Sequence, residues 1–128
     1  MLTFFDHCGT HVDAPYPFEA DGAKVDELAL DVLIGRARVV EIATERVIQK
    51  ADLLALDLDN VEWLLLKTRN SLIVNSKEFT KNFVSVGADA AEFIVARGIK
   101  LVGIDYCSIE EITSKAIRPT TLSCEMVS

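Results

Sequence analysis

Two nearly continuous apolar runs constrain the fold most, because a strand of that composition is expected to be buried on both faces. The first run is Val61–Thr68 and the second is Ile99–Ile104. Between them, Ala88–Arg97 repeats apolar residues at helical spacing, and Gly98 supplies a left-handed stop. The strand, helix and strand together predict one α/β unit.

The flanking segments have less regular patterns. We predict strands at Leu2–His7 and Arg36–Ala43, a short helical turn at Gln49–Leu54 and an ordered loop at Gly9–Lys24, which is rich in glycine, proline, aspartate and alanine. Val25–Ile34 is rich in apolar residues, but its pattern favours neither a helix nor a strand. Ser114–Ser128 is polar and weakly periodic, so we do not expect it to form a packed final element.

Length and charge limit the function classes. The 128 residues fit one domain, and a net charge of −7 makes nucleic acid an unsuitable partner. No apolar run approaches the roughly 20 residues of a membrane span, and the N-terminus lacks a signal-peptide pattern. The three cysteines, at positions 8, 107 and 124, do not suggest a disulfide framework. We therefore expect a cytoplasmic protein with reduced thiols.

His7, His11 and Asp13 offer the donor atoms that hold Zn²⁺ or Mn²⁺. The intervening Gly9 and the nearby Pro15 make a helix improbable here. In an extended chain, positions 7, 11 and 13 share a face, but a straight strand would separate positions 7 and 11 by about 13 Å. The chain must therefore bend, and Gly9 permits the bend.

The residue types alone leave a second interpretation open. His7 and His11 are also consistent with ordinary loop histidines whose rings are hydrogen-bonded. They are the only two histidines of the chain, and both lie within five residues beside an aspartate. This clustering favours the metal site.

The run His7–Pro15 resembles the signature His-x-Gly-Thr-His-x-Asp-x-Pro of the cyclase and kynurenine formamidase family of metal-dependent hydrolases. The resemblance extends to about Ile112. It includes Lys24–Leu28, Leu33–Ala37, Leu64–Arg69 and Gly98–Asp105 with Ser108 after it. The histidine motif is specific, and the other segments support it.

The resemblance implies an α/β fold of the swivelling, cyclase-like type, with a central mixed sheet flanked by helices. It also implies a divalent metal (zinc or manganese, with zinc favoured), a homo-oligomer (dimer or tetramer) and a small amide or cyclic substrate such as N-formylkynurenine. The residues that match the family's metal ligands are His7, His11 and Asp13. A bound metal would activate water and polarise the scissile carbonyl.

Other residues are candidates for the surrounding pocket. Gly9 and Thr10 lie inside the motif, and Phe18 flanks it as a candidate for an aromatic pocket or a core contact. Asp105 and Ser108 follow a predicted strand, and ligands gather at the carboxyl ends of such strands. A capped turn formed by Asp105 and Ser108 is the alternative.

The chain departs from the family pattern in three respects. Pro17 stands where family members commonly carry a histidine that resembles a general acid/base, and proline cannot transfer a proton. No histidine follows His11, so Glu125 is the remaining candidate for a late ligand. Both ends of the single domain 1–128 look short. These departures predict an incomplete, single-ion site, and the alternative function is a catalytically impaired or truncated relative that binds a metal or another ligand.

Overall fold

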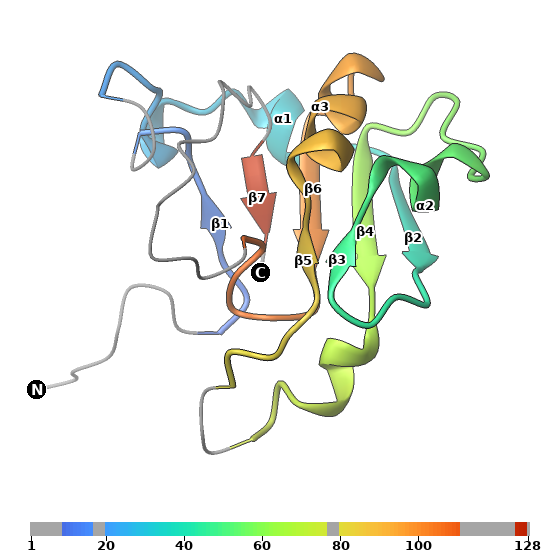
Figure 1. Cartoon of the computed structure of the whole chain (residues 1–128). Coiled ribbons are helices and arrows are strands. Elements are labelled where there is room, and N and C mark those ends of the chain that lie inside the picture. Colours follow the sequence, from blue (N-terminus) through green and yellow to red (C-terminus); the bar gives the residue numbers. More distant parts are fainter. Residues whose placement is uncertain (1–8, 17–19, 77–79, 111–124, 128) are drawn as a thin grey trace, which may run out of the picture.

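The centre of the protein is a five-stranded mixed sheet (Figure 1). The computed structural model describes residues 9–16, 20–76, 80–110 and 125–127. Across the sheet the strands are β1 (Val12–Asp13), β7 (Glu125–Val127), β6 (Leu101–Ile104), β4 (Trp63–Lys67) and β2 (Ala37–Glu41). Strands β2, β4, β6 and β7 are parallel, and β1 is antiparallel to β7. The predicted α/β fold with a mixed central sheet is confirmed.

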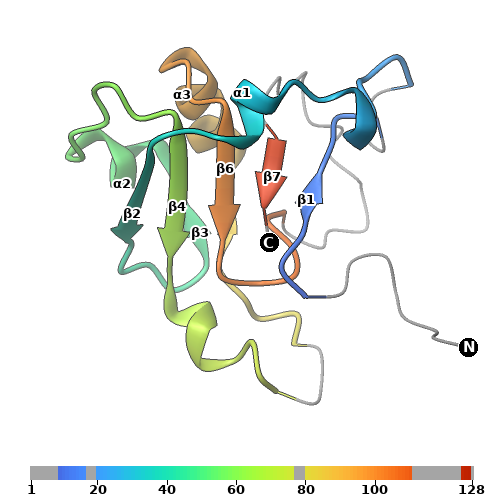
Figure 2. The same ribbon diagram turned by 180° about the vertical axis from the view of Figure 1, so that it is seen from behind.

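Helices and a small second sheet cover one face of the large sheet (Figure 1). This layer contains β3 (Val47–Ile48), α2 (Lys50–Leu54), β5 (Ser85–Val86) and α3 (Ala88–Ala96), and β3 pairs with β5 in parallel. On the other side, η1 (Val25–Glu27) and α1 (Leu30–Leu33) pass near the amino ends of the parallel strands (Figure 2). The turn η2 (Arg69–Leu72) follows the carboxyl end of β4.

Helix α3 begins and ends where its sequence predicts. Its first turn is held by Asp89, whose carboxylate accepts hydrogen bonds from the backbone N–H of Ala90 at 2.8 Å and of Lys50 at 3.0 Å. The second bond also ties α3 to the start of α2. At the other end, Gly98 adopts a φ of 72°, a conformation that glycine reaches without steric cost. No helix in the described parts of the chain is long and apolar enough to cross a membrane.

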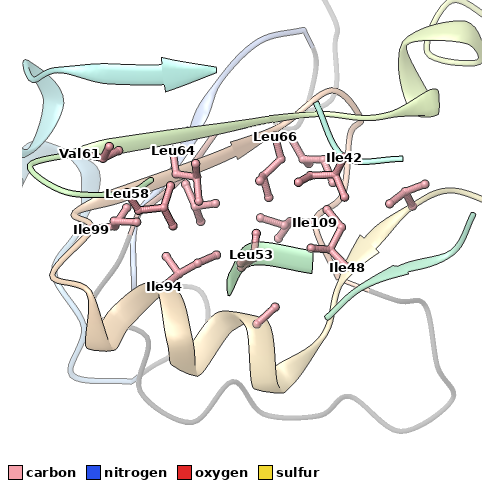
Figure 3. Close-up of a cluster of buried hydrophobic side chains, with 14 residues drawn as sticks. Ile42, Ile48, Leu53, Leu58, Val61, Leu64, Leu66, Ile94, Ile99 and Ile109 are labelled. Atoms are coloured by element: carbon pink, nitrogen blue, oxygen red, sulfur yellow. The ribbon is translucent and has the colours of Figure 1, made fainter. Parts of the chain in front are cut away.

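The hydrophobic core lies between the covered face of the sheet and α3 (Figure 3). Leu64 and Leu66 of β4 point toward Ile94 of α3 and Leu53 of α2, and all four side chains are buried. Val102 and Ile104 of β6 join the same cluster. Burying one such side chain contributes about 1.5–3 kcal/mol, so this contact layer is the main source of stability.

Two predictions about the ends of the chain are wrong. The segment Ser114–Ser128 contains a packed element, because Glu125–Val127 forms β7 between β1 and β6. The segment Gly9–Lys24 is a loop only in part, because Val12–Asp13 forms β1. Strands of two or three residues are too short to show a period, and here pairing with a neighbouring strand determines them. The predicted strand Leu2–His7 lies outside the described residues.

The apolar run of β4 is buried on one face only, which differs from the prediction. Leu64 and Leu66 are buried, whereas Trp63 and Leu65 on the opposite face are partly exposed. The layer that contains α2 and α3 covers the first pair, and the second pair is on the face away from it (Figures 1 and 2).

The side chain of Asn70 in η2 is buried and polar, and it bonds to the backbone of Val84 in the way that a neighbouring strand would. Its amide group donates to the carbonyl of Val84 at 2.8 Å and accepts from the N–H of Val84 at 2.7 Å. Both residues are fully buried, so water cannot substitute for these bonds. The pair fixes the turn after β4 to the segment that leads into β5.

We expect Asn70→Ala to lower the free energy of unfolding by about 2–4 kcal/mol, because both polar groups of Val84 would lose their partner. Urea denaturation measures this change. Asn82→Ala is the matched control, since Asn82 is exposed, and a change within about 0.5 kcal/mol is expected there. Equal effects of the two substitutions would contradict the role of Asn70.

Gly35 precedes β2 and lies against the edge of Trp63. A Cβ atom at position 35 would be 2.8 Å from Nε1 of Trp63, which is closer than a real contact permits. This nitrogen is buried and has no hydrogen-bond partner within the described residues. We expect Gly35→Ala to cost about 1–3 kcal/mol through overpacking.

Trp63 is the only tryptophan of the chain, so its fluorescence reports on this contact directly. The emission maximum of Gly35→Ala should shift as the indole moves, and the urea midpoint should fall. An unchanged spectrum together with an unchanged midpoint would show that residue 35 does not press on the indole.

Candidate metal site on strand β1

His11 immediately precedes strand β1 and lies toward the carboxyl edge of the parallel strands, whereas Asp13 lies within the sheet. Asp13 is paired with Met126 of β7, and Met126 is paired with Val102 of β6. Because β1 runs antiparallel to β7, His11 lies beyond this row, toward the end at which β6 stops. Ligands of α/β sheets gather at this edge. The register thus brings the histidine motif to the place where a site is expected.

The ring of His11 is oriented by the backbone of Gly9. Nδ1 of His11 lies 2.8 Å from the carbonyl oxygen of Gly9. A carbonyl can only accept a hydrogen bond, so Nδ1 carries the proton and the lone pair of the neutral ring is on Nε2. Gly9 has a φ of 74°, which confirms the predicted bend at this residue. Metal-bound histidines are commonly held by such a bond from the second nitrogen.

Nε2 of His11 and Oδ2 of Asp13 are 3.6 Å apart, and both side chains are mostly buried, at 16% and 18% exposure. Two ligand atoms bound to one tetrahedral zinc ion lie about 3.4 Å apart. The separation therefore fits a pair of donors that share one ion. The same distance also suits an ion pair between Asp13 and a His11 ring that carries a proton on both nitrogens.

The remaining proposed ligands are described only in part. His7 lies outside the described residues, as do Pro17 and Phe18. Within the ranges that are described, no group of three His, Cys, Asp or Glu side chains is arranged to hold a metal ion. Glu125 belongs to β7, one position before Met126, the partner of Asp13. Its backbone is thus close to the histidine motif.

Asp105 immediately follows β6 and holds the turn after β4. Its carboxylate accepts hydrogen bonds from the backbone N–H of Thr68 at 2.9 Å and from the hydroxyl of Thr68 at 2.8 Å. It also accepts from the backbone N–H of Ser71 at 3.0 Å and from the hydroxyl of Ser71. A carboxylate has about four acceptor positions. Three of these bonds end on Oδ2 and one ends on Oδ1, so the carboxylate is held mainly through Oδ2 and ties the end of β6 to the turn after β4.

The sequence did not predict the partners of Asp105. Thr68 is buried and also caps η2 by accepting from the N–H of Asn70 at 3.0 Å. Nearby, the hydroxyl of Tyr106 donates to the carbonyl of Thr80 at 2.9 Å, and its ring stacks on Phe83 at 4.6 Å between centroids. The polar run Thr68–Ser71 directly after a buried strand was the available signal. That polar run does not reveal that its residues bond to Asp105, which is 34 to 37 residues farther along the chain.

The other pocket candidates lie around the same edge. Thr10 is exposed, and the hydroxyl of Ser108 donates to the carbonyl of Glu110 at 3.3 Å, as expected of a turn. Burial raises the pKa of Glu110 above its usual range. Cys107 is exposed and is a free thiol.

Comparison with known proteins adds to this geometry. The model of a family described as putative cyclase matches residues 1–111. A kynurenine formamidase of Bacillus cereus is 36% identical over 116 residues, which are 91% of this chain and 54% of that protein. A kynurenine formamidase of Bacillus mycoides is 37% identical with the same coverage. The chain spans about half the length of the curated relatives it matches.

Two solved structures have the same fold. One, described as a potential metal-dependent hydrolase with cyclase activity, superposes with a TM-score of 0.84 at 28% identity and matches 98% of this chain and 63% of that one. A predicted metal-dependent hydrolase from Bacillus stearothermophilus gives a TM-score of 0.77 at 28% identity, with 98% and 62% covered. The family match over residues 1–111 and the identity to these relatives show that the chain belongs to the cyclase family.

Proposed function

We propose that this chain is a metal-dependent hydrolase of small amides, with N-formylkynurenine as its substrate and kynurenine and formate as products. The observation that carries the proposal is the pair of His11 and Asp13, whose donor atoms are 3.6 Å apart, with His11 toward the carboxyl edge of the sheet. The name shared by the curated relatives, kynurenine formamidase, supports the choice of substrate. A bound zinc ion would supply an activated water and a polarised carbonyl.

The ligands in this proposal are His7, His11 and Asp13. Gly9 holds the ring of His11 through the 2.8 Å contact to Nδ1, so Nε2 is presented to the ion as a neutral donor. The carboxylate of Asp13 would neutralise one of the two positive charges of the divalent cation. Asp105 accepts four hydrogen bonds from Thr68 and Ser71, so we assign it to holding the turn after β4 and leave it out of the ligand set.

A second function is favoured by the residue at position 17. Where the resemblance predicts an acid/base histidine, this chain has Pro17, which has no titratable group. Loss of a general base typically reduces the rate by about 10²–10⁴. The alternative is therefore a relative that binds the metal or another small ligand but turns over slowly.

We expect the purified protein to bind about one zinc ion per chain, measured by elemental analysis after dialysis. His11→Ala and Asp13→Asn should each reduce the bound zinc strongly, because each removes one of three protein ligands. Cys107→Ser is the control, since an exposed thiol can hold zinc adventitiously, and it should bind as much zinc as the unaltered chain. Less than a tenth of an ion in the unaltered protein would exclude the site.

If the missing base limits turnover, Pro17→His should raise kcat/KM for N-formylkynurenine by about 10²–10⁴. Formation of kynurenine, followed by its absorbance, measures the rate. The double substitution Pro17→His with His11→Ala should lose the gain, because the water-activating ion would no longer be held.

A Pro17→His protein that binds zinc but hydrolyses no faster than the unaltered chain would favour the second function. Activity that persists at full level in His11→Ala would reject the proposed use of the motif.

A further inference from the structure

The loop that follows strand β1 returns on itself and brings Lys24 back to the end of the histidine motif. The backbone N–H of Tyr16 donates to the carbonyl of Ala23 at 3.1 Å. A Cβ atom at Gly22 would lie 2.8 Å from the carbonyl carbon of Pro15 and 2.9 Å from the nitrogen of Tyr16, so only glycine fits between the two arms of the loop. Lys24 is therefore held one residue beyond the point at which the loop closes.

The ammonium group of Lys24 lies over an aromatic ring. Its Nζ is 5.3 Å from the centroid of the Tyr16 ring, which is within the range of a cation–π contact. The backbone N–H of Lys24 donates to Oε2 of Glu27 at 2.8 Å, so the base of the side chain is fixed as well. Among the described residues, neither of these contacts pairs the ammonium group with a carboxylate.

Two other lysines of this chain do have carboxylate partners. Nζ of Lys67 is 3.0 Å from Glu41, and Nζ of Lys100 is 3.4 Å from Glu62. The chain carries a net charge of −7, so carboxylates outnumber the cations that can pair with them. The charge of Lys24, held over a ring instead, remains available to an anion that arrives from solution.

Tyr16 is close to the candidate metal site along the chain. It is three residues after Asp13, and three extended residues span at most about 11 Å. Asp13 is mostly buried and Ala14 is buried, whereas Tyr16 is 49% exposed. Strand β1 runs from His11 toward the amino ends of the parallel strands. A substrate held at His11 and Asp13 would therefore extend along β1 to reach Tyr16 at the rim.

We propose that Lys24, positioned by the ring of Tyr16, binds the carboxylate of an aryl amide substrate that carries an amino-acid side chain. This subsite rests on the proposed function, in which the formamide of N-formylkynurenine is bound between His11 and Asp13. The α-carboxylate is then the anionic group at the far end of the substrate. Its pairing with the ammonium group of Lys24 selects amino-acid substrates over neutral aryl formamides.

Isothermal titration calorimetry on the purified chain tests the subsite with L-kynurenine, the proposed product, and with kynuramine, which lacks only the carboxylate. Lys24→Met should weaken the binding of L-kynurenine about 5-fold, as expected for the loss of an exposed ion pair. It should not weaken the binding of kynuramine, which offers no carboxylate. Tyr16→Phe keeps the ring and should bind L-kynurenine as the unaltered chain does, whereas Tyr16→Leu should bind it more weakly.

Lys50→Met is the matched control. Nζ of Lys50 lies 5.8 Å from the centroid of the Phe93 ring, in the layer of α2 and α3, so the substitution removes the same charge from a similar contact. It should leave the affinity for both probes unchanged. The subsite is rejected if Lys24→Met binds L-kynurenine as tightly as the unaltered chain, if Lys50→Met weakens binding equally, or if the unaltered chain does not bind L-kynurenine.

Hydrolysis assays on the same variants separate the subsite from the proposed function. A carboxylate-specific loss of binding in a chain that does not hydrolyse N-formylkynurenine would uphold the subsite and reject the catalysis. Hydrolysis with the same kcat/KM in Lys24→Met as in the unaltered chain would uphold the catalysis and reject the subsite.

Discussion

The packing of β4 and β6 against α3 holds the rest of the molecule in place. Leu64 and Leu66 are buried against Ile94, and the two strands pair in register through Leu64 and Val102. Because β6 is fixed in this way, its other edge is positioned to pair with β7, and β7 in turn pairs with β1. The position of the histidine motif therefore depends on a core that lies two strands away.

The sheet and its carboxyl edge contain two aspartates in different environments. Asp105 is surrounded by hydrogen-bond donors from Thr68 and Ser71 and fixes the turn after β4. Asp13 lies beside the imidazole of His11. The same side-chain type thus serves structure in one position and is a candidate ligand in the other. The groups beside each carboxylate, two hydroxyl-bearing residues in one case and an imidazole in the other, distinguish the two roles better than its place in the sequence does.

Long apolar or periodic segments were predictable from the sequence, and short ones were not. Strand β4, strand β6 and helix α3 have enough residues to show their pattern, and the predicted boundaries agree within two residues. Strands β1 and β7 have two and three residues, so only their partners define them. The bend at Gly9 followed from the distance that two imidazoles can span, which is a local argument.

The candidate site was predictable as far as its residues are close in sequence. His11 and Asp13 are two residues apart along the chain, so their contact follows from the motif. By contrast, the bonds of Asp105 to Thr68 and of Asn70 to Val84 join segments 37 and 14 residues apart. Such pairings depend on how the strands are ordered in the sheet. The half-covered face of β4 was missed for the same reason, since an apolar run does not reveal what will cover it.

The proposed metal site uses His7, His11 and Asp13 as the protein ligands of one ion. X-ray absorption spectroscopy of the zinc-loaded chain tests it most directly, because it measures the atoms bound to the metal. We expect only nitrogen and oxygen neighbours, at about 2.0–2.2 Å, with the outer-shell scattering of two imidazole rings. A neighbour at about 2.3 Å, the distance of a thiolate sulfur, or the absence of imidazole scattering would contradict it.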